Sequence, residues 1–424
     1  MDTFFKRTLL SLAIVATNSA FASDYNKTIE DALKIGSDGG IKADINYRFE
    51  NVDQFSGVIS TTNPANPKTA NANTIRTRFG ILSPSFHGVQ GFAEYEGTHA
   101  MQSDYNDARG HNTGFSTIAD PVYNELNQLW LSYSGLPDTL IKGGRQRIKF
   151  DDDRFIGNVG WRQLETTFDS ALITNKSLPN TTINAGYIGN VQTFTATTEN
   201  INAPILNVNY KLGDYGNLIG YGYWLDYTDQ NLAIRNKSNQ TFGLRLNGAT
   251  PKIYTNYNLL YTAEWSIQQD YGHRTTSYEA NRFNMMGGFN AYFMTFQGAM
   301  EQLNGNGSGQ FNTPLGTNHA FQGWADLFLI TPKDGIRDVF GTVSAKVWDD
   351  SLTIAGVYHD YTDDTGNIAY GKEWDFQATK KFGKHYSVMA KYANYIADNT
   401  ARTASSAYTT TDTQKIWIQG NINF

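Results

Sequence analysis

Cationic side chains stand at every second position near the start of residues 143–169, GGRQRIKFDDDRFIGNVGWRQLETTFD; they are Arg145, Arg147 and Lys149. Alternate residues of a β-strand share one face and lie about 7 Å apart along it. Guanidinium groups held in such a row can bind carboxylates in a bidentate manner. The spacing therefore predicts one rung of an anion-attracting wall. Ion pairs with four carboxylates are the alternative, and would neutralise the row: Glu94, Glu96, Glu125 and Asp169.

The other reactive residues do not form a recognisable catalytic motif. The histidines stand singly, without a Gly-x-Ser-x-Gly elbow or a metal-binding spacing: His87, His99, His111, His273, His319, His359 and His385. His359 is adjacent to Asp360, but neighbouring residues of a strand point to opposite faces. The chain has no cysteine. We therefore predict a protein that is not an enzyme and needs no metal or organic cofactor.

A period-two alternation of apolar and polar residues predicts the strands that position these side chains. The last strand alternates Ile416, Ile418 and Ile422 with polar residues and ends at Phe424, as outer-membrane barrels commonly do. The pattern occurs in eighteen segments: residues 41–52, 73–83, 88–101, 124–134, 139–149, 166–173, 181–190, 204–213, 217–228, 239–248, 252–266, 279–290, 292–302, 337–348, 351–361, 370–381, 385–396 and 412–424.

The connections between these segments alternate in length. The short ones are residues 84–87, 135–138, 174–180, 214–216, 249–251, 349–350 and 382–384. The long, polar ones are residues 53–72, 102–123, 150–165, 191–203, 267–278, 303–336 and 397–411. This predicts an all-β fold: a transmembrane, antiparallel, up-and-down β-barrel of 18 strands, with short periplasmic turns and long extracellular loops. We expect residues 151–154 to form a solvated acidic loop.

The N-terminus has the features of an export signal. Lys6 and Arg7 precede a short apolar run, and Ala20 and Ala22 are the small residues that signal peptidase reads. We predict a signal peptide at residues 1–22, a periplasmic lead-in at 23–38 and the barrel at 39–424. The location is then the outer membrane, with the assembly machinery as a partner during insertion.

Composition agrees with a barrel. The chain holds 25 Tyr, 25 Phe, 8 Trp and 39 Gly but only 10 Pro, which suits long strands and aromatic girdles. The mean hydropathy is −0.46, and residues 23–424 hold no apolar run of the roughly 20 residues that a spanning helix needs. A net charge of −6 argues against nucleic acid as a partner.

Charged residues that alternate with apolar ones should face the lumen, because Arg or Lys facing lipid at the midplane costs about 2 to 4 kcal/mol. An 18-stranded barrel leaves room for an aqueous channel. The predicted pore lining is Arg48, Arg76, Arg78, Glu94, Glu96, Arg145, Arg147, Arg245 and Arg282. Aromatic residues such as Tyr221, Tyr223, Trp374 and Phe376 are expected to face the outer-membrane lipid.

Residues 312–332 are unusually apolar for an exposed loop. Phe321, Trp324, Leu327 and Phe328 have helix-like spacing. One interpretation is a loop folded into the barrel mouth as a constriction or lid. The other is a loop that packs against the upper barrel wall or the neighbouring loops.

These segments resemble the alginate export family of outer-membrane porins. The firmest points are RTRFG at 76–80, GRQRIKFDDDRFIGNVGWRQLETTFD at 144–169 and TPLGTNHAFQGWADLFL at 313–329. The resemblance implies a monomeric, 18-stranded barrel that binds anionic uronate polymers. It places Arg76, Arg78, Arg145 and Arg147 inside matching segments.

The expected function is a channel for passive passage of anionic solutes, with uronate or alginate-type polysaccharide export as its specific form. A general diffusion porin for small sugars and other hydrophilic nutrients is the alternative, since Glu94 and Glu96 interrupt a uniformly positive path. An adhesion or structural barrel with a plugged lumen would conduct no ions.

Overall fold

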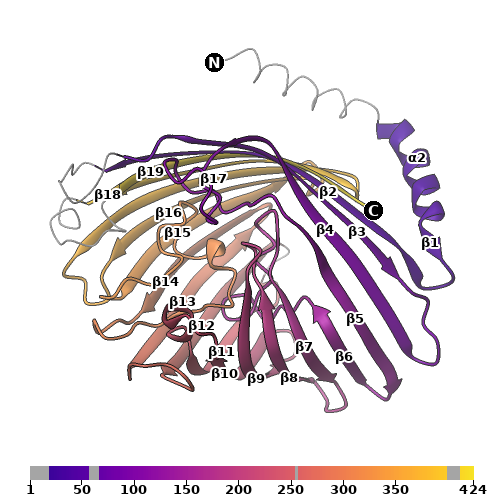
Figure 1. Ribbon diagram of the computed structural model, residues 1–424, viewed down its shortest axis with the longest axis horizontal. Coiled ribbons are helices and arrows are strands. Elements are labelled where there is room, and N and C mark those ends of the chain that lie inside the picture. The colour runs from indigo at the N-terminus through magenta and orange to yellow at the C-terminus, as the bar shows by residue number, and fades with distance from the viewer. Residues whose placement is uncertain (1–18, 57–65, 254–255, 399–410) are drawn as a thin grey trace.

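Eighteen long strands, β2 to β19, form one closed antiparallel sheet in the computed structural model (Figure 1). The structure describes residues 19–56, 66–253, 256–398 and 411–424. Each strand pairs with its neighbours in the chain, and β19 closes on β2, with Thr411 opposite Ser56 and Asn423 opposite Asp44. Closure leaves none of these strands with an unpaired edge.

The predicted fold class is confirmed, and each of the predicted segments contains a strand. Their bounds are β2 (Gly39–Ser56), β3 (Ala70–Leu82), β4 (Val89–Asp104), β5 (Asn124–Leu136), β6 (Thr139–Gln146), β7 (Thr167–Asn175), β8 (Thr181–Gln192), β9 (Thr198–Lys211), β10 (Gly216–Tyr227), β11 (Asn239–Ala249), β12 (Tyr257–Gln269), β13 (Glu279–Ala291), β14 (Met294–Leu303), β15 (Ile336–Val347), β16 (Leu352–Thr362), β17 (Ala369–Phe382), β18 (Tyr386–Ala397) and β19 (Thr411–Asn423).

The connections keep the predicted alternation at most positions. Short turns join β3 to β4, β5 to β6 and the following pairs through β17 to β18, all at one end of the barrel. The opposite end carries the longer loops, and a short helix α3 (Leu232–Arg235) lies in one of them. Parts of the predicted loops 53–72 and 397–411, at residues 57–65 and 399–410, lie outside the described residues.

The N-terminal segment lies at the end that carries the short turns. Helix α2 (Ser19–Ala32) leads to a two-residue strand, β1 (Lys34–Ile35), which pairs with the start of β2. The Glu30 carboxylate lies 2.6 Å from the Lys384 ammonium and 2.5 Å from His385, in the turn between β17 and β18. The predicted signal peptide stays a prediction, and its residues 1–18 lie outside the described part. Among the described helices, none has the length and apolar character needed to cross a membrane.

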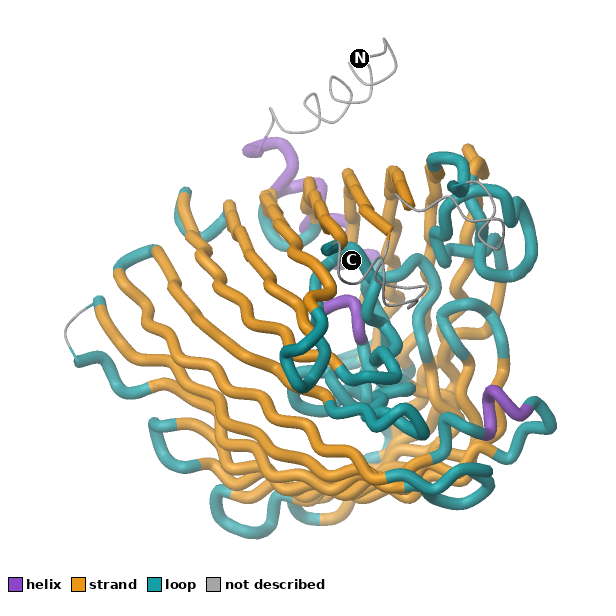
Figure 2. The backbone as a smooth tube through the Cα atoms, turned by 90° about the vertical axis from the view of Figure 1, so that its left-hand side faces the viewer, coloured by secondary structure: helices purple, strands orange, loops and turns teal. Residues whose placement is uncertain are grey.

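Two long loops, residues 147–166 and 304–335, fold into the barrel (Figure 2). Phe155 of the first loop stands 6.1 Å, centroid to centroid, from Phe311 of the second. Both rings are buried, and so is Phe328. Residues 312–332 therefore combine parts of both interpretations: the loop enters the barrel, and there it packs against the wall.

This filling corrects the orientation predicted for two aromatic residues of β10. Tyr221 and Tyr223 were expected to face lipid, but both are buried, with ring centroids 4.9 and 5.9 Å from Phe155. The reason is that the inward loops make a dry core against β10. On β10 an aromatic residue is therefore as favourable on the inner face of the strand as on the outer face.

The helix-like spacing at 321–328 does not correspond to a helix. The regular structure there is a 3-10 turn, η1 (Asn318–Ala320), and the chain after it is irregular. Phe328 packs on Tyr361 and Tyr395 of the wall at centroid distances of 4.7 and 5.9 Å. The apolar residues of the loop are therefore spaced to meet wall side chains rather than to form one helical face.

Candidate functional site

A cavity of about 760 Å³ lies between one side of the barrel wall and the inward loops. The wall side is formed by lumen-facing residues of β2 to β5: Lys42, Asp44, Arg78, Gln90, Phe92, Glu94, Gln128 and Trp130. The loop side is formed by Arg147, Lys149, Asp153, Asn158, Trp161, Glu165 and Thr317. The cavity thus runs along one side of the lumen, while aromatic residues fill the part next to β10.

Charges of both signs line this cavity, and at its loop side the cations are the more exposed partners, whereas at the wall Asp44 is more exposed than its partner Arg76. The Arg147 side chain is 31% exposed, whereas its partners Glu94 and Glu165 are 6% and 0% exposed. Lys149 is 54% exposed and its partner Asp153 18%. A solute in the cavity would therefore find the Arg147 guanidinium and the Lys149 ammonium more accessible than their carboxylate partners, which also line the cavity.

Glu165 is the centre of the polar network behind the cavity. Its carboxylate accepts hydrogen bonds from Arg147 Nε at 2.5 Å, Asn127 Nδ2 at 2.5 Å and Asn158 Nδ2 at 2.6 Å. Arg78 lies 3.6 Å away and pairs also with Glu96. Burial alone would raise the pKa of Glu165, but the charges on Arg78 and Arg147 outweigh it and lower the pKa to about 2. The loop is therefore tied to the wall by an ionised carboxylate.

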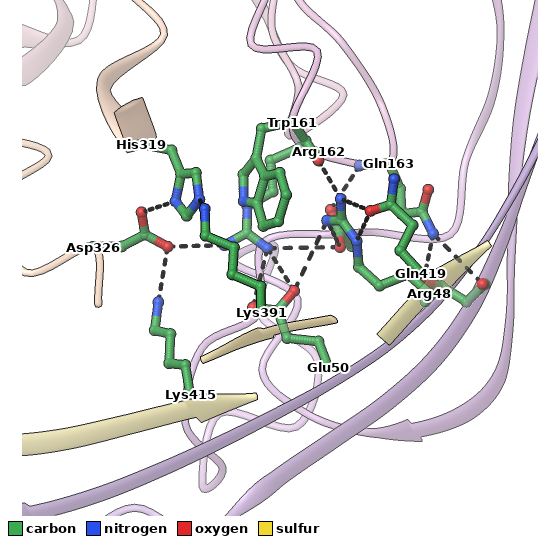
Figure 3. A network of polar contacts seen from close by, with 12 residues as sticks. Arg48, Glu50, Trp161, Arg162, Gln163, His319, Asp326, Lys391, Lys415 and Gln419 are labelled. Carbon is green, nitrogen blue, oxygen red and sulfur yellow. Dashed lines mark hydrogen bonds and ion pairs between the residues drawn. The ribbon is translucent and has the colours of Figure 1, made fainter. Parts of the chain in front are cut away.

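A second network joins both loops to the seam between β2 and β19 (Figure 3). Arg162 of the first loop contacts Glu50 of β2 at 3.0 Å and Asp326 of the second loop at 3.4 Å. Asp326 also accepts from Lys415 of β19 at 2.8 Å. Arg48 of β2 donates to Gln419 of β19 at 2.9 Å and to the backbone oxygen of Trp161.

A third network lies on the far side of the lumen. Arg154 of the first loop and Arg282 of β13 share Glu301, with Nε–Oε1 distances of 3.1 and 2.5 Å. Arg282 also contacts Glu264 at 3.0 Å. Arg154 was predicted to lie in a solvated acidic loop, but it is buried in the lumen. The loop enters the barrel because these wall carboxylates satisfy its guanidinium group.

Eight of the nine predicted pore-lining residues lie on the lumen side: Arg48, Arg76, Arg78, Glu94, Glu96, Arg147, Arg245 and Arg282. Each is part of an ion pair or hydrogen bond. For Arg147 the partner Glu94 is one of the four carboxylates that the alternative interpretation of the sequence named. Of these eight, Arg78, Glu94 and Arg147 line the cavity.

Arg145 departs from the prediction. It stands opposite Leu129 in the sheet, and the Leu129 side chain is exposed on the outer face, whereas the next pair, Trp130 and Gly144, includes the cavity-lining Trp130. Arg145 pairs with Asp169 at 2.7 Å on that outer face. The predicted rung of three cations is therefore not formed, because β6 ends at Gln146 and Arg147 and Lys149 belong to the loop.

Several residues of the polar networks were not singled out from the sequence. Arg162 and Glu165 lie within the matching segment 144–169, and His319 and Asp326 lie within the matching segment 313–329. For His319 and Asp326 the available signal was a polar or charged residue inside an unusually apolar loop, because such residues become buried only with partners. Lys391 and Lys415 gave no comparable signal, since each occupies an ordinary lumen-facing strand position.

Acidification should loosen the inward loops while leaving the barrel intact. The pKa of Glu165 is about 2 in the folded state and near 4.5 when unfolded, so its stabilisation is present above pH 4.5 and lost toward pH 2. Burial lowers the pKa of His319 from 6.5 to about 3. The stabilisation of the loops by its neutral form is therefore complete above pH 6.5 and decreases as the pH falls from 6.5 to 3.

Tryptophan fluorescence and far-UV circular dichroism between pH 7 and pH 2 would measure this response. The emission, which includes Trp161 and Trp324 of the loops, should change as the pH falls, whereas the strand signal should not. Emission that stays constant down to pH 3 would contradict the role given to His319.

A closed barrel with a solute-sized, charged cavity in its lumen defines an outer-membrane channel of the porin class. Solved porins share the fold. OpdQ of Pseudomonas aeruginosa is 14% identical with a TM-score of 0.67, over 92% of this chain and 99% of that one. A BenF-like porin of Pseudomonas fluorescens Pf-5 is 12% identical with a TM-score of 0.68, over 92% and 99%. OccAB2 of Acinetobacter baumannii is 13% identical with a TM-score of 0.68, over 91% and 98%.

The sequence profile described as alginate export matches residues 44–322. This range covers more than half of the chain, and the chain belongs to the alginate export family. A comparison with curated protein sequences found no match. The outer membrane is accordingly its location, and the predicted resemblance is confirmed.

Proposed function

We propose that the protein passes small anionic solutes, and carboxylates in particular, by passive diffusion through the cavity. The observation that carries this proposal is the unequal exposure of the ion-pair partners on the loop side of the cavity, where Arg147 and Lys149 are more exposed than their carboxylate partners. A nearby cation lowers the electrostatic cost of an entering anion. The carboxylates keep the binding weak enough for release, which conduction requires.

The remainder of the lining supports a solute with an apolar or sugar-ring body. Phe92 and Trp130 lie 5.5 Å apart and both line the cavity, facing the loop side that carries the exposed cations. Aromatic faces bind apolar rings and the C–H faces of sugars. The OpdK structure of P. aeruginosa, a complex with vanillate, shares this fold at 12% identity, with a TM-score of 0.66 over 91% of this chain and 98% of that one.

The size of the cavity favours small acids, including single uronates and short oligomers, over a long polymer. Two loops occupy the lumen, and ion pairs on three sides of the barrel hold them there. Export of an alginate-type polysaccharide would require at least one loop to leave the lumen. Passage of monomers and short chains requires no such rearrangement.

Planar-bilayer recordings with the purified full chain test the proposal. The reversal potential in a potassium chloride gradient should show a preference for chloride. Glucuronate and short uronate oligomers should reduce the chloride current, and glucose at the same concentration should reduce it much less. Equal effects of glucose and glucuronate, without ion preference, would favour the general diffusion porin, and a lack of conductance would indicate a plugged barrel.

A further inference from the structure

A single ammonium group contacts both inward loops and the barrel wall. Lys391 of β18 is buried in the lumen. Its Nζ lies 3.7 Å from the ring centroid of Trp324 in the second loop and 4.3 Å from that of Trp161 in the first loop. Trp417 of β19 completes the enclosure at 5.6 Å. Cation–π contacts of a desolvated ammonium are stronger than those of an exposed one.

The same ammonium orients His319 of the second loop. Lys391 Nζ lies 2.7 Å from His319 Nε2, and His319 Nδ1 lies 2.5 Å from the Asp326 carboxylate. Because an ammonium group only donates, Nε2 must accept, and the neutral ring donates its Nδ1 proton to Asp326. Lys415 holds the other oxygen of Asp326 at 2.8 Å. The ring of His319 is thus fixed by polar contacts at both of its nitrogens.

His319 in turn fixes Trp161, which lines the cavity. The two rings are stacked, with centroids 4.2 Å apart and planes inclined by 3°. The guanidinium group of Arg48 lies 4.4 Å from the Trp161 centroid, and the Trp161 side chain therefore lies between His319 and Arg48 (Figure 3). One wall of the cavity therefore depends on a chain of contacts that starts at Lys391, although Lys391 does not itself line the cavity.

We propose that Lys391 is a positioning residue for conduction: through His319 and Trp161 it latches the two loops together and sets the width of the passage. The inference goes beyond the proposed preference for anions, because it concerns the dimensions of the channel. It does not depend on which solute passes. Other ion pairs of the loops, such as Arg154 with Glu301, remain when this latch is removed, so the release is local.

Single-channel recordings of three variants of the full chain test the latch. Lys391→Met keeps the volume but removes the charge, and His319→Phe keeps the stacked ring but removes both polar contacts. Both should raise the single-channel conductance by about twofold and add current fluctuations, because a freed Trp161 no longer narrows the passage. His319→Gln supplies an acceptor for Lys391 and a donor for Asp326 but no ring to stack on Trp161, so its conductance should lie between that of His319→Phe and that of the wild type.

The matched control is Lys380→Met. Lys380 lies on the adjacent strand β17, 4.8 Å from the Trp348 centroid, and does not contact the loops. It should leave the conductance unchanged. If Lys391→Met does not insert, His319→Phe and His319→Gln decide the question alone. Wild-type conductance in His319→Phe would overturn the latch.

The ion preference separates this inference from the proposed function. It should stay at the wild-type value in the latch variants, since Arg147 and Lys149 are unchanged. A conductance change that always came with a loss of chloride preference would show that Lys391 acts as a charge on the path, and would overturn its positioning role. A wild-type channel without ion preference would contradict the proposed function and leave the conductance comparison valid.

Discussion

Replacing Arg147 and Lys149 together by glutamine should remove the preference of the channel for anions. Glu94 and Asp153 would then line the cavity without an ion-pair partner, and Glu165 would keep only Arg78. A unit charge at 4 Å contributes about 1 kcal/mol to the interaction with a monovalent ion even in bulk water. Two such charges correspond to a change in permeability ratio of roughly tenfold or more. The reversal potential in a salt gradient would measure it.

Arg145→Gln is the matched control for this double variant. Arg145 lies two residues before Arg147 but on the outer face, where it pairs with Asp169. Its removal should leave the chloride preference unchanged. An unaltered reversal potential in the double variant would exclude the exposed cations from the mechanism, and an effect of Arg145→Gln would place that residue on the ion path after all.

Glu165→Gln should have the opposite effect on ion preference and a large effect on stability. The substitution leaves Arg78 and Arg147 with one carboxylate each, Glu96 and Glu94, and gives the region behind the cavity an additional net positive charge. The chloride preference should therefore rise. Breaking a buried ion pair by removing one partner costs about 3 to 5 kcal/mol. The amide NH2 group of the glutamine would also face N–H donors of residues such as Arg147 and Asn158, from which the Glu165 carboxylate now accepts hydrogen bonds.

Urea unfolding of the barrel in lipid vesicles, together with the reversal potential, would test both effects of this variant. Asp169→Asn serves as the control, because it breaks a partly exposed pair on the outer face and should cost less than about 1 kcal/mol. A Glu165→Gln channel of wild-type stability would show that the pairing of Arg147 with Glu94 suffices to hold the loop. An unchanged preference would show that permeating ions do not sense this charge.

The strands could be predicted because their pattern is local. A bilayer on one side and water or polar groups on the other force apolar and polar residues to alternate, and this shows in any ten consecutive residues. The inward loops could not be predicted in this way. Arg154 meets Glu301 across 147 positions of sequence, and Arg162 meets Glu50 across 112. Nothing in the neighbourhood of either arginine identifies its partner.

The faces were predicted correctly only where charge identified the inner side. At Tyr221 and Tyr223 both sides of the strand are apolar, because the loops form a dry core inside the barrel. The expectation that aromatic residues face the lipid therefore does not hold there. At Arg145 the strand continues for only one more residue, and the chain then turns into the lumen, so the alternation from Arg145 to Arg147 crosses the end of a strand. A single sequence does not mark that end.

The seam between β2 and β19 has a consequence for the order of assembly. Arg48 and Glu50 on the first long strand, and Lys415 on the last, all contact loops that lie between them in the chain. Seating the loops and closing the seam are therefore linked reactions, and each makes the other more favourable by the same free energy. A barrel whose ends have met around an unfilled lumen lacks partners for these charges, so loop seating belongs to the final joining of the two ends.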